Sequence, residues 1–169
     1  MLFLLNACAS GDIDAGPGTR VINIVNFKTG ERVYGAYAHD GHYDRDVMER
    51  ISHLFRDQTT HEEHPIDPHL IDVMEELLSA LALPQDTQIE LTSGYRTPEH
   101  QADMAQRDEN AARKSLHTTG QAADIRIPGV KGKAIGAVAQ TMQKGGVCYY
   151  PKTGHIHVDT GRVRTWEAK

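Results

Sequence analysis

The strongest constraint on the fold is the alternation of polar and apolar residues in "GHIHVDTG", near the C-terminal end of the chain. In a β-strand successive side chains point to opposite faces of the sheet, so His155, His157 and Asp159 share one face. Ile156 and Val158 then point to the other face and into a core. The stretch therefore predicts a strand with one buried face and one face that carries two imidazoles and a carboxylate.

The rest of the chain switches between strand-like and helix-like periodicity. The patterns predict these elements in order: a hairpin over 19–43, helices over 44–57 and 66–83, a strand over 88–93, a polar helix over 97–114, a strand over 122–127, a helix over 131–146, and strands over 147–150 and 155–160. We expect an α+β fold in which a small antiparallel sheet packs against helices.

At 169 residues the chain has the length of one domain, and it shows neither an internal repeat nor a linker. Its 18 basic and 23 acidic residues give a formal net charge of -5, without a cluster of lysines or arginines. Nucleic-acid binding is therefore not expected, because it needs a concentrated positive surface. The sequence gives no basis for inferring a protein partner.

The first ten residues, "MLFLLNACAS", are apolar but too short to span a membrane, and they lack the basic start of a signal peptide. We interpret residues 1–18 as the flexible remnant of a leader, followed by one folded domain over 19–169. "LNAC" resembles a bacterial lipoprotein cleavage site, which would make Cys8 the attachment point of a lipid anchor. Cys148 lies in no metal-binding spacing and is expected to be a small buried residue.

A second polar stretch, "SLHTTGQAAD", sets His117 and Asp124 seven positions apart. Together with His157 they could supply the three nitrogen and oxygen ligands that a catalytic zinc takes from a protein. Taken alone, histidines in such patterns are more often exposed residues, or residues that only contact a metal ligand. Arg96 in "SGYRTP", taken alone, is more often a surface ion-pair partner. The combination of the three stretches in one chain favours a site.

These stretches also carry a resemblance to a known family. "SGYR" at 93–96 is followed by "SLHTTGQAAD" at 115–124, which matches the pattern S-x-H-x-x-G-x-A-x-D at every defined position, and by "GGVCYYPKTGHIHVDTGRVRTW" at 145–166. In these motifs the chain resembles the zinc D-Ala-D-Ala peptidase group, which shares its zinc site with lysostaphin-type peptidases and the hedgehog amino-terminal domain. Within that group it is most similar to the YcbK-type periplasmic murein endopeptidases, over residues 19–166.

The resemblance implies a hedgehog-like or D-Ala-D-Ala peptidase-like fold in which His117, Asp124 and His157 hold Zn²⁺. In the zinc D,D-carboxypeptidases a histidine at the position of His155 lies beside the metal, so His155 is expected to accept or shuttle a proton. Other members carry an acidic general base at the position of Gly154, and that version of the mechanism cannot apply here.

The resemblance also suggests roles for residues around the metal ligands. Arg96 is expected to bind a substrate carboxylate or the developing oxyanion. Ser115 and Asp159 are expected to orient the histidine ligands through their free N–H groups, although backbone capping explains both residues equally well. The segment "HEEHPIDPH" favours a solvated loop over a second metal site, because its prolines break any regular spacing. Tyr149, Tyr150 and Trp166 could line a substrate groove, but strand aromatics are more typical of a core.

The expected function is that of a periplasmic or secreted zinc metallopeptidase acting on peptidoglycan peptides. The nearest resemblance favours a murein endopeptidase that cleaves cross-links between stem peptides. Two alternatives stay open: a D,D-carboxypeptidase, and a zinc-bound but catalytically silent domain that binds the cell wall.

Overall fold

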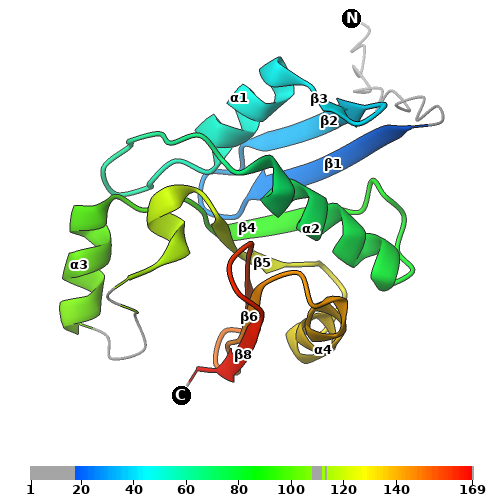
Figure 1. Ribbon diagram of the computed structural model, residues 1–169. Coiled ribbons are helices and arrows are strands. Elements are labelled where there is room, and N and C mark those ends of the chain that lie inside the picture. The colour runs from blue at the N-terminus through cyan, green and yellow to red at the C-terminus, as the bar shows by residue number, and fades with distance from the viewer. Residues whose placement is uncertain (1–17, 108–111, 113, 169) are drawn as a thin grey trace, which may run out of the picture.

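The structure, a computed structural model, describes residues 18–107, 112 and 114–168. Its elements follow in this order (Figure 1): β1 (Thr19–Asn26), β2 (Arg32–His39), β3 (His42–Tyr43), α1 (Arg45–Leu54), α2 (Pro68–Ala80), β4 (Ile89–Ser93), α3 (Pro98–Arg107), η1 (Leu116–Thr119), β5 (Ala122–Arg126), α4 (Gly132–Met142), β6 (Gly146–Tyr149), β7 (Ile156–Asp159) and β8 (Arg164–Glu167). Within this part of the chain, no helix is both long and apolar enough to cross a membrane. The expected lipid anchor at Cys8 lies outside the described residues.

The strands of the described residues form one eight-stranded sheet in the order β3-β2-β1-β4-β5-β7-β6-β8. Most neighbours are antiparallel, but β1 with β4 and β6 with β8 are parallel. The expected small antiparallel sheet is therefore inexact, because the sheet is larger and mixed. The first parallel pair arises because the chain leaves β1 and β2 through α1 and α2 and enters β4 in the direction of β1, as a crossover connection does.

Helices α1 and α2 begin where the sequence predicts them, because capping residues mark their first turns. Asp44 accepts a hydrogen bond from the backbone N–H of Val47 and caps α1, while Asp67 caps α2, which begins with Pro68. Residues 61–67 form the loop expected between these two helices. Of the helix expected over 97–114, α3 covers Pro98–Arg107, and residues 108–111 and 113 lie outside the described residues.

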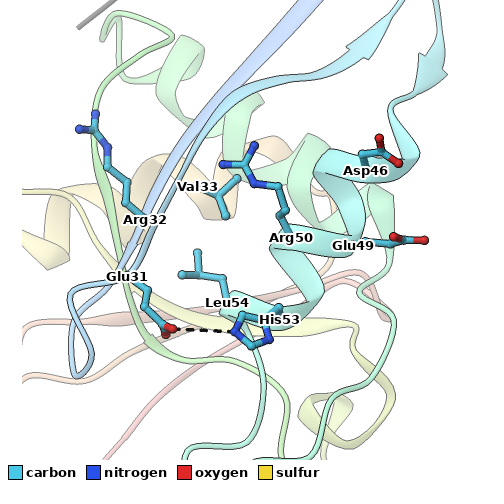
Figure 2. A pocket seen from close by; sticks show the side chains of 8 residues that line it. All are labelled: Glu31, Arg32, Val33, Asp46, Glu49, Arg50, His53 and Leu54. Carbon is cyan, nitrogen blue, oxygen red and sulfur yellow. Dashed lines mark ion pairs between the residues drawn. The ribbon is translucent and has the colours of Figure 1, made fainter. Parts of the chain in front are cut away.

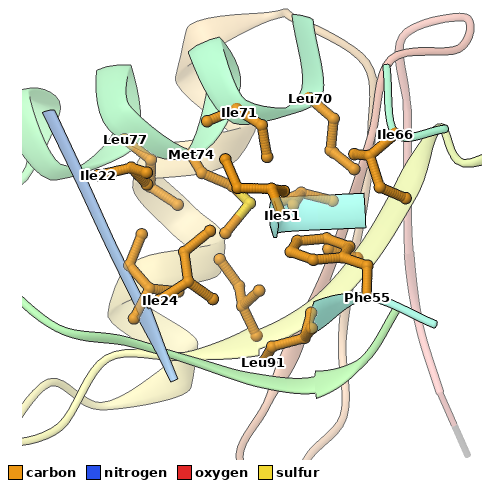
Figure 3. Packing of buried hydrophobic residues seen from close by; sticks show 14 of the residues in the cluster. Ile22, Ile24, Ile51, Phe55, Ile66, Leu70, Ile71, Met74, Leu77 and Leu91 are labelled. Carbon is orange, nitrogen blue, oxygen red and sulfur yellow. The ribbon is translucent and has the colours of Figure 1, made fainter. Parts of the chain in front are cut away.

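The core lies on one face of the sheet, under α1, α2 and α4. Helix α1 contacts β2, α2 contacts β1 and β7, and α4 contacts β6 and β7. Figure 3 shows the aliphatic side chains of α2 pointing down between those of β1 and those of α1. The fully buried members of this cluster include Ile22, Ile24, Ile51, Phe55, Leu70, Ile71, Met74 and Leu77. Burial of these apolar side chains is the largest favourable contribution to the free energy of folding.

The opposite face of the central strands carries the polar residues. Ile125 of β5 and Ile156 and Val158 of β7 belong to the core, so the residues between them point to the other face. In Figure 1, α2 and α4 lie to the right of β5, whereas α3 lies to its left. Cys148 of β6 is buried, as expected from the sequence.

Candidate metal centre

Strands β5 and β7 bring two of the candidate ligands together. In this antiparallel pair Asp124 lies directly opposite His157. Because their chain neighbours Ile125 and Ile156 point into the core, both polar side chains project from the other face. They are nevertheless buried there, with 5% and 6% of their surfaces exposed. Segments that cover this face of the sheet therefore help to enclose the site.

The short helix η1 brings the third candidate ligand. The side chain of Ser115 accepts a hydrogen bond from the backbone N–H of His117 and caps the helix. Gly120 ends it in the left-handed conformation, with φ of 67°. A side chain at this position would also collide with the carbonyl oxygen of Pro65. The turn that returns the chain to β5 therefore requires glycine.

The hydrogen bonds of the two imidazoles determine which nitrogen of each ring faces the site. Nδ1 of His117 lies 2.6 Å from the carbonyl oxygen of Gly94, which can only accept, so Nδ1 donates and Nε2 keeps an electron pair. Nε2 of His157 lies 2.9 Å from Oδ2 of Asp159 and donates to this carboxylate, so in the neutral ring Nδ1 keeps an electron pair. Each ring thus presents one free electron pair to the other.

Three electron-pair donors converge at this point. Nε2 of His117 and Nδ1 of His157 lie 3.2 Å apart, and Oδ1 of Asp124 lies 3.3 Å from the first and 3.0 Å from the second. Ligand atoms roughly 2.0–2.2 Å from a tetrahedral zinc are separated by about 3.3–3.6 Å. The three atoms therefore approximate one face of such a tetrahedron. This is also the group of potential metal ligands found within the described residues.

The electrostatics of the cluster favour a bound cation. Burial raises the pKa of Asp124, but its interactions with the imidazoles of His117 and His157 outweigh burial and hold this pKa well below its usual value. Burial is the largest influence on His117 and lowers its pKa. Burial lowers the pKa of His157 as well, but hydrogen bonds to Asp124 and Asp159 more than offset it. The bond to Asp124 uses a proton on Nδ1, and a bound metal ion would take the place of that proton. An ionised, buried carboxylate beside two imidazole electron pairs matches the nitrogen and oxygen donor set of zinc.

Arg96 contacts the cluster through Asp124. Its Nη2 donates to Oδ2 of Asp124 at 2.8 Å, which leaves Oδ1 of that carboxylate facing the two histidines. Its Nε donates to Oγ of Ser93 at 3.0 Å, and its Nη1 donates to Oε1 of Gln101 at 3.1 Å. These contacts use three of the five N–H groups of a guanidinium. Arg96 is thus an ion-pair partner of a candidate ligand, and it also borders the hollow beside it.

A hollow of about 250 Å³ opens next to the cluster. Its walls come from α3, η1, the end of β6 and β8, and they include His117, His157, Arg96, Gln101, Ser115, Tyr150, Arg164 and Trp166. Trp166 is 39% exposed, and its ring centroid lies 5.4 Å from that of His157. The expectation of a core position is confirmed for Tyr149, which packs against the core. It is wrong for Tyr150, just after β6, and for Trp166 of the edge strand β8, because both border this hollow.

His155 lies just before β7 rather than within it. Its ring stacks on Tyr150 with centroids 4.2 Å apart, and its Nδ1 lies 2.7 Å from Oγ1 of Thr153. It is not a member of the metal-ligand group, but the Tyr150 ring on which it stacks borders the hollow. The structure therefore brings together His117, Asp124, His157 and Arg96, and it leaves His155 at their periphery.

The two residues expected to support the histidine ligands have different contacts. Asp159 accepts a hydrogen bond from the His157 ring, whereas Ser115 contacts the backbone of His117 and not its ring. The ring of His117 instead donates to Gly94, whose backbone carbonyl no sequence pattern could have singled out. Gln101 is a second such case, because its side chain joins Arg96 to the carbonyl oxygen of Ala112.

A second hollow, of about 600 Å³, lies between α1 and the start of β2, away from the cluster. Figure 2 shows its walls, with Glu31 and His53 facing each other at one end and Arg50 pointing across it. Nε2 of His53 lies 3.8 Å from Oε1 of Glu31, and both side chains are largely exposed. Its charges of both signs are solvated, and its histidine and acidic side chains are not among the described groups that could hold a metal.

Comparison with known proteins identifies the family of this chain. The family model described as peptidoglycan L,D-endopeptidase MepK matches residues 14–166. The chain is 34% identical over 151 residues to a probable peptidoglycan L,D-endopeptidase MepK of Haemophilus influenzae, covering 89% of this chain and 81% of that protein. It is 34% identical over 150 residues, with the same coverage, to the peptidoglycan L,D-endopeptidase MepK of Escherichia coli K12. No solved structure matches the chain significantly. Because the match extends over most of both sequences and includes the whole candidate metal centre, the chain belongs to the peptidoglycan L,D-endopeptidase MepK family.

Proposed function

We propose that this protein is a zinc-dependent murein endopeptidase that hydrolyses amide bonds in the cross-links between peptidoglycan stem peptides. The observation that carries the proposal is the convergence of three electron pairs, from His117, Asp124 and His157, beside a hollow open to solvent. Membership of the family supports peptide-bond hydrolysis as the reaction and peptidoglycan as the substrate, because the relatives are named peptidoglycan L,D-endopeptidases. Residues 19–169 would act as one domain on the side of the cytoplasmic membrane where peptidoglycan lies.

The three ligands would hold Zn²⁺, which supplies a Lewis acid for the scissile carbonyl and for a nucleophilic water. His117 and His157 are held in the ligating orientation by their hydrogen bonds to Gly94 and Asp159. Asp124 is held by Arg96, and its remaining oxygen is directed to the metal. The chain thus fixes the site before substrate binds, as a preorganised site requires.

Arg96 has a second role in this proposal. Two of its N–H groups are not used in the contacts with Ser93, Gln101 and Asp124, and the side chain borders the hollow. Those groups can donate to a substrate carboxylate or to the oxyanion that develops during amide hydrolysis. Stem-peptide cross-links fit this arrangement, because their amide bonds lie beside free carboxylates that an arginine binds well. A single oxyanion donor contributes about 10²-fold or more to the rate.

His155 is the residue that we propose carries the proton between water and the leaving amine. Support comes from its stacking on Tyr150, which borders the hollow, and from glycine at position 154, where other members carry an acidic base. The His155→Ala variant should keep its zinc and lose about 10²- to 10⁴-fold in turnover. Turnover and metal content are measured on the same preparations. Thr153→Ala, which removes the hydroxyl and methyl groups beside Nδ1 but keeps the imidazole, is the matched control. Wild-type turnover in His155→Ala would transfer the proton-carrying role to another group.

The function is tested by digesting purified substrates with zinc-loaded protein and analysing the products by mass spectrometry. Cross-linked dimeric muropeptides should be converted to monomers, and a chelator should stop the reaction until zinc is restored. Release of terminal D-alanine from uncross-linked pentapeptides alone would instead indicate a D,D-carboxypeptidase. Inertness toward both substrates with zinc bound would favour a silent domain that binds the cell wall.

A further inference from the structure

Asp159 lies next to the metal-ligand cluster and accepts hydrogen bonds from several groups besides the imidazole of His157. Its side chain is fully buried, and its Oδ2 accepts from Nε2 of His157 at 2.9 Å. Its Oδ1 accepts from the backbone N–H groups of Gly146 and Gly161, each at 2.9 Å. Arg164 then reaches both oxygens of the same carboxylate. A buried carboxylate in this position is stable only if such donors compensate for its loss of hydration.

Arg164 binds Asp159 in a two-pronged geometry. Nη2 of Arg164 lies 2.6 Å from Oδ2, and Nη1 lies 3.0 Å from Oδ1. Its guanidinium also lies 4.8 Å from the ring centroid of Trp166, on the same face of β8, and Nη1 donates to the carbonyl oxygen of Arg162. Paired contacts of this kind fix the plane of a carboxylate as well as its position, which a single donor does not.

The sequence leaves room for this pair at two glycines. Gly146 lies opposite Arg164 in the parallel pair of β6 and β8. A Cβ at position 146 would collide with Nη1 of Arg164 and lie 2.5 Å from Oδ2 of Asp159. A Cβ at Gly161 would collide with the side chain of Leu116 and would lie 3.1 Å from Oδ1 of Asp159, a tight contact. The short edge strand β8 can therefore place Arg164 against Asp159 only because position 146 carries no side chain.

We propose that Arg164 is a positioning residue of the metal site, acting through Asp159 to hold the ring of His157 with Nδ1 directed at the ion. The inference rests on the metal centre of the proposed function and is independent of the substrate. If Arg164 is removed, Asp159 loses the donor that fixes its plane, and the hydrogen bond that orients His157 is no longer held in one direction. Partners of this kind typically contribute about 10- to 100-fold to metal affinity.

The test measures metal binding rather than activity. Zinc dissociation constants are determined by competition with a chromogenic chelator for the wild type, Arg164→Ala, Arg164→Lys and, as the matched control, Arg162→Ala, which removes an exposed arginine two positions away. Arg164→Ala should bind zinc about 10- to 100-fold more weakly. Arg164→Lys should recover part of this loss, because it restores the charge but only one donor, and Arg162→Ala should bind as the wild type does.

The visible absorption spectrum of the Co²⁺-substituted protein separates positioning from a general loss of structure. The ligand-field bands of Arg164→Ala should shift, and free guanidinium at millimolar concentration should restore both the bands and the affinity. Far-ultraviolet circular dichroism of each variant verifies the fold. Wild-type zinc affinity and unchanged Co²⁺ bands in a folded Arg164→Ala would overturn the inference while leaving the proposed function intact. A wild-type protein that binds no zinc would overturn both.

Discussion

The His157→Ala variant is expected to lose its zinc and at least about 10³-fold in kcat/KM, since a Lewis acid worth several kcal/mol disappears with it. His157 contributes one of three electron pairs that lie 3.0 to 3.3 Å apart, and two remaining ligands hold zinc poorly. Metal content measured on protein purified without a histidine tag, together with muropeptide turnover, provides the check. Wild-type protein should contain one zinc per chain.

The exposed His42 supplies the control for this prediction. His42→Ala removes an imidazole outside the cluster and should leave both metal content and turnover unchanged. Full zinc occupancy in folded His157→Ala would sink the assignment of this residue as a ligand. Retained activity without zinc would be equally damaging to the proposed chemistry.

The Arg96→Leu variant should show the second largest effect. Arg96 and Asp124 form a buried ion pair, with 13% and 7% of their side chains exposed, and removing one partner of such a pair costs roughly 3–5 kcal/mol. We expect the free energy of unfolding to fall by about that amount in zinc-free protein and by less in zinc-loaded protein, because the metal itself compensates for the charge of Asp124. Turnover should fall by about 10²-fold or more through loss of the oxyanion donor.

Urea unfolding with and without a chelator measures this difference. Arg107→Ala is the matched control, because Arg107 forms an exposed ion pair with Asp103 and such a pair contributes about 0–1 kcal/mol. An equal loss of stability in the presence and absence of zinc would show that Asp124 does not share its charge with the metal. An unchanged turnover in the Arg96→Leu variant would remove Arg96 from the reaction.

Local sequence patterns were sufficient to predict the strands that carry Asp124 and His157, but not the short helix η1 that carries His117. The alternation of "HIHVDT" assigned His157 and Asp159 to the face opposite Ile156 and Val158, and the structure has this arrangement. His155 shows the limit of that reasoning. Strand pairing begins at Ile156, so a periodicity that continues past the end of a strand says little about where the next side chain lies.

The parts that sequence could not predict are those held by distant or backbone partners. β8 is a short, largely exposed strand, and its parallel pairing with β6 depends on contacts that no local pattern records. No local pattern therefore indicates a role for Arg164, because that role depends on the position of β8 beside Asp159. The same holds for Gly94, whose contribution is a carbonyl oxygen. The expectation of a small antiparallel sheet is inexact, because strand order and direction are tertiary properties that strand propensity does not specify.

The most direct test of the account is a crystal structure of the zinc-loaded protein with anomalous difference density measured at the zinc absorption edge. We predict a single strong peak bonded to Nε2 of His117, Oδ1 of Asp124 and Nδ1 of His157, the three atoms that the contacts with Gly94, Arg96 and Asp159 leave facing the site. Density at any other position, or ligation through Nδ1 of His117 or Nε2 of His157, would contradict it.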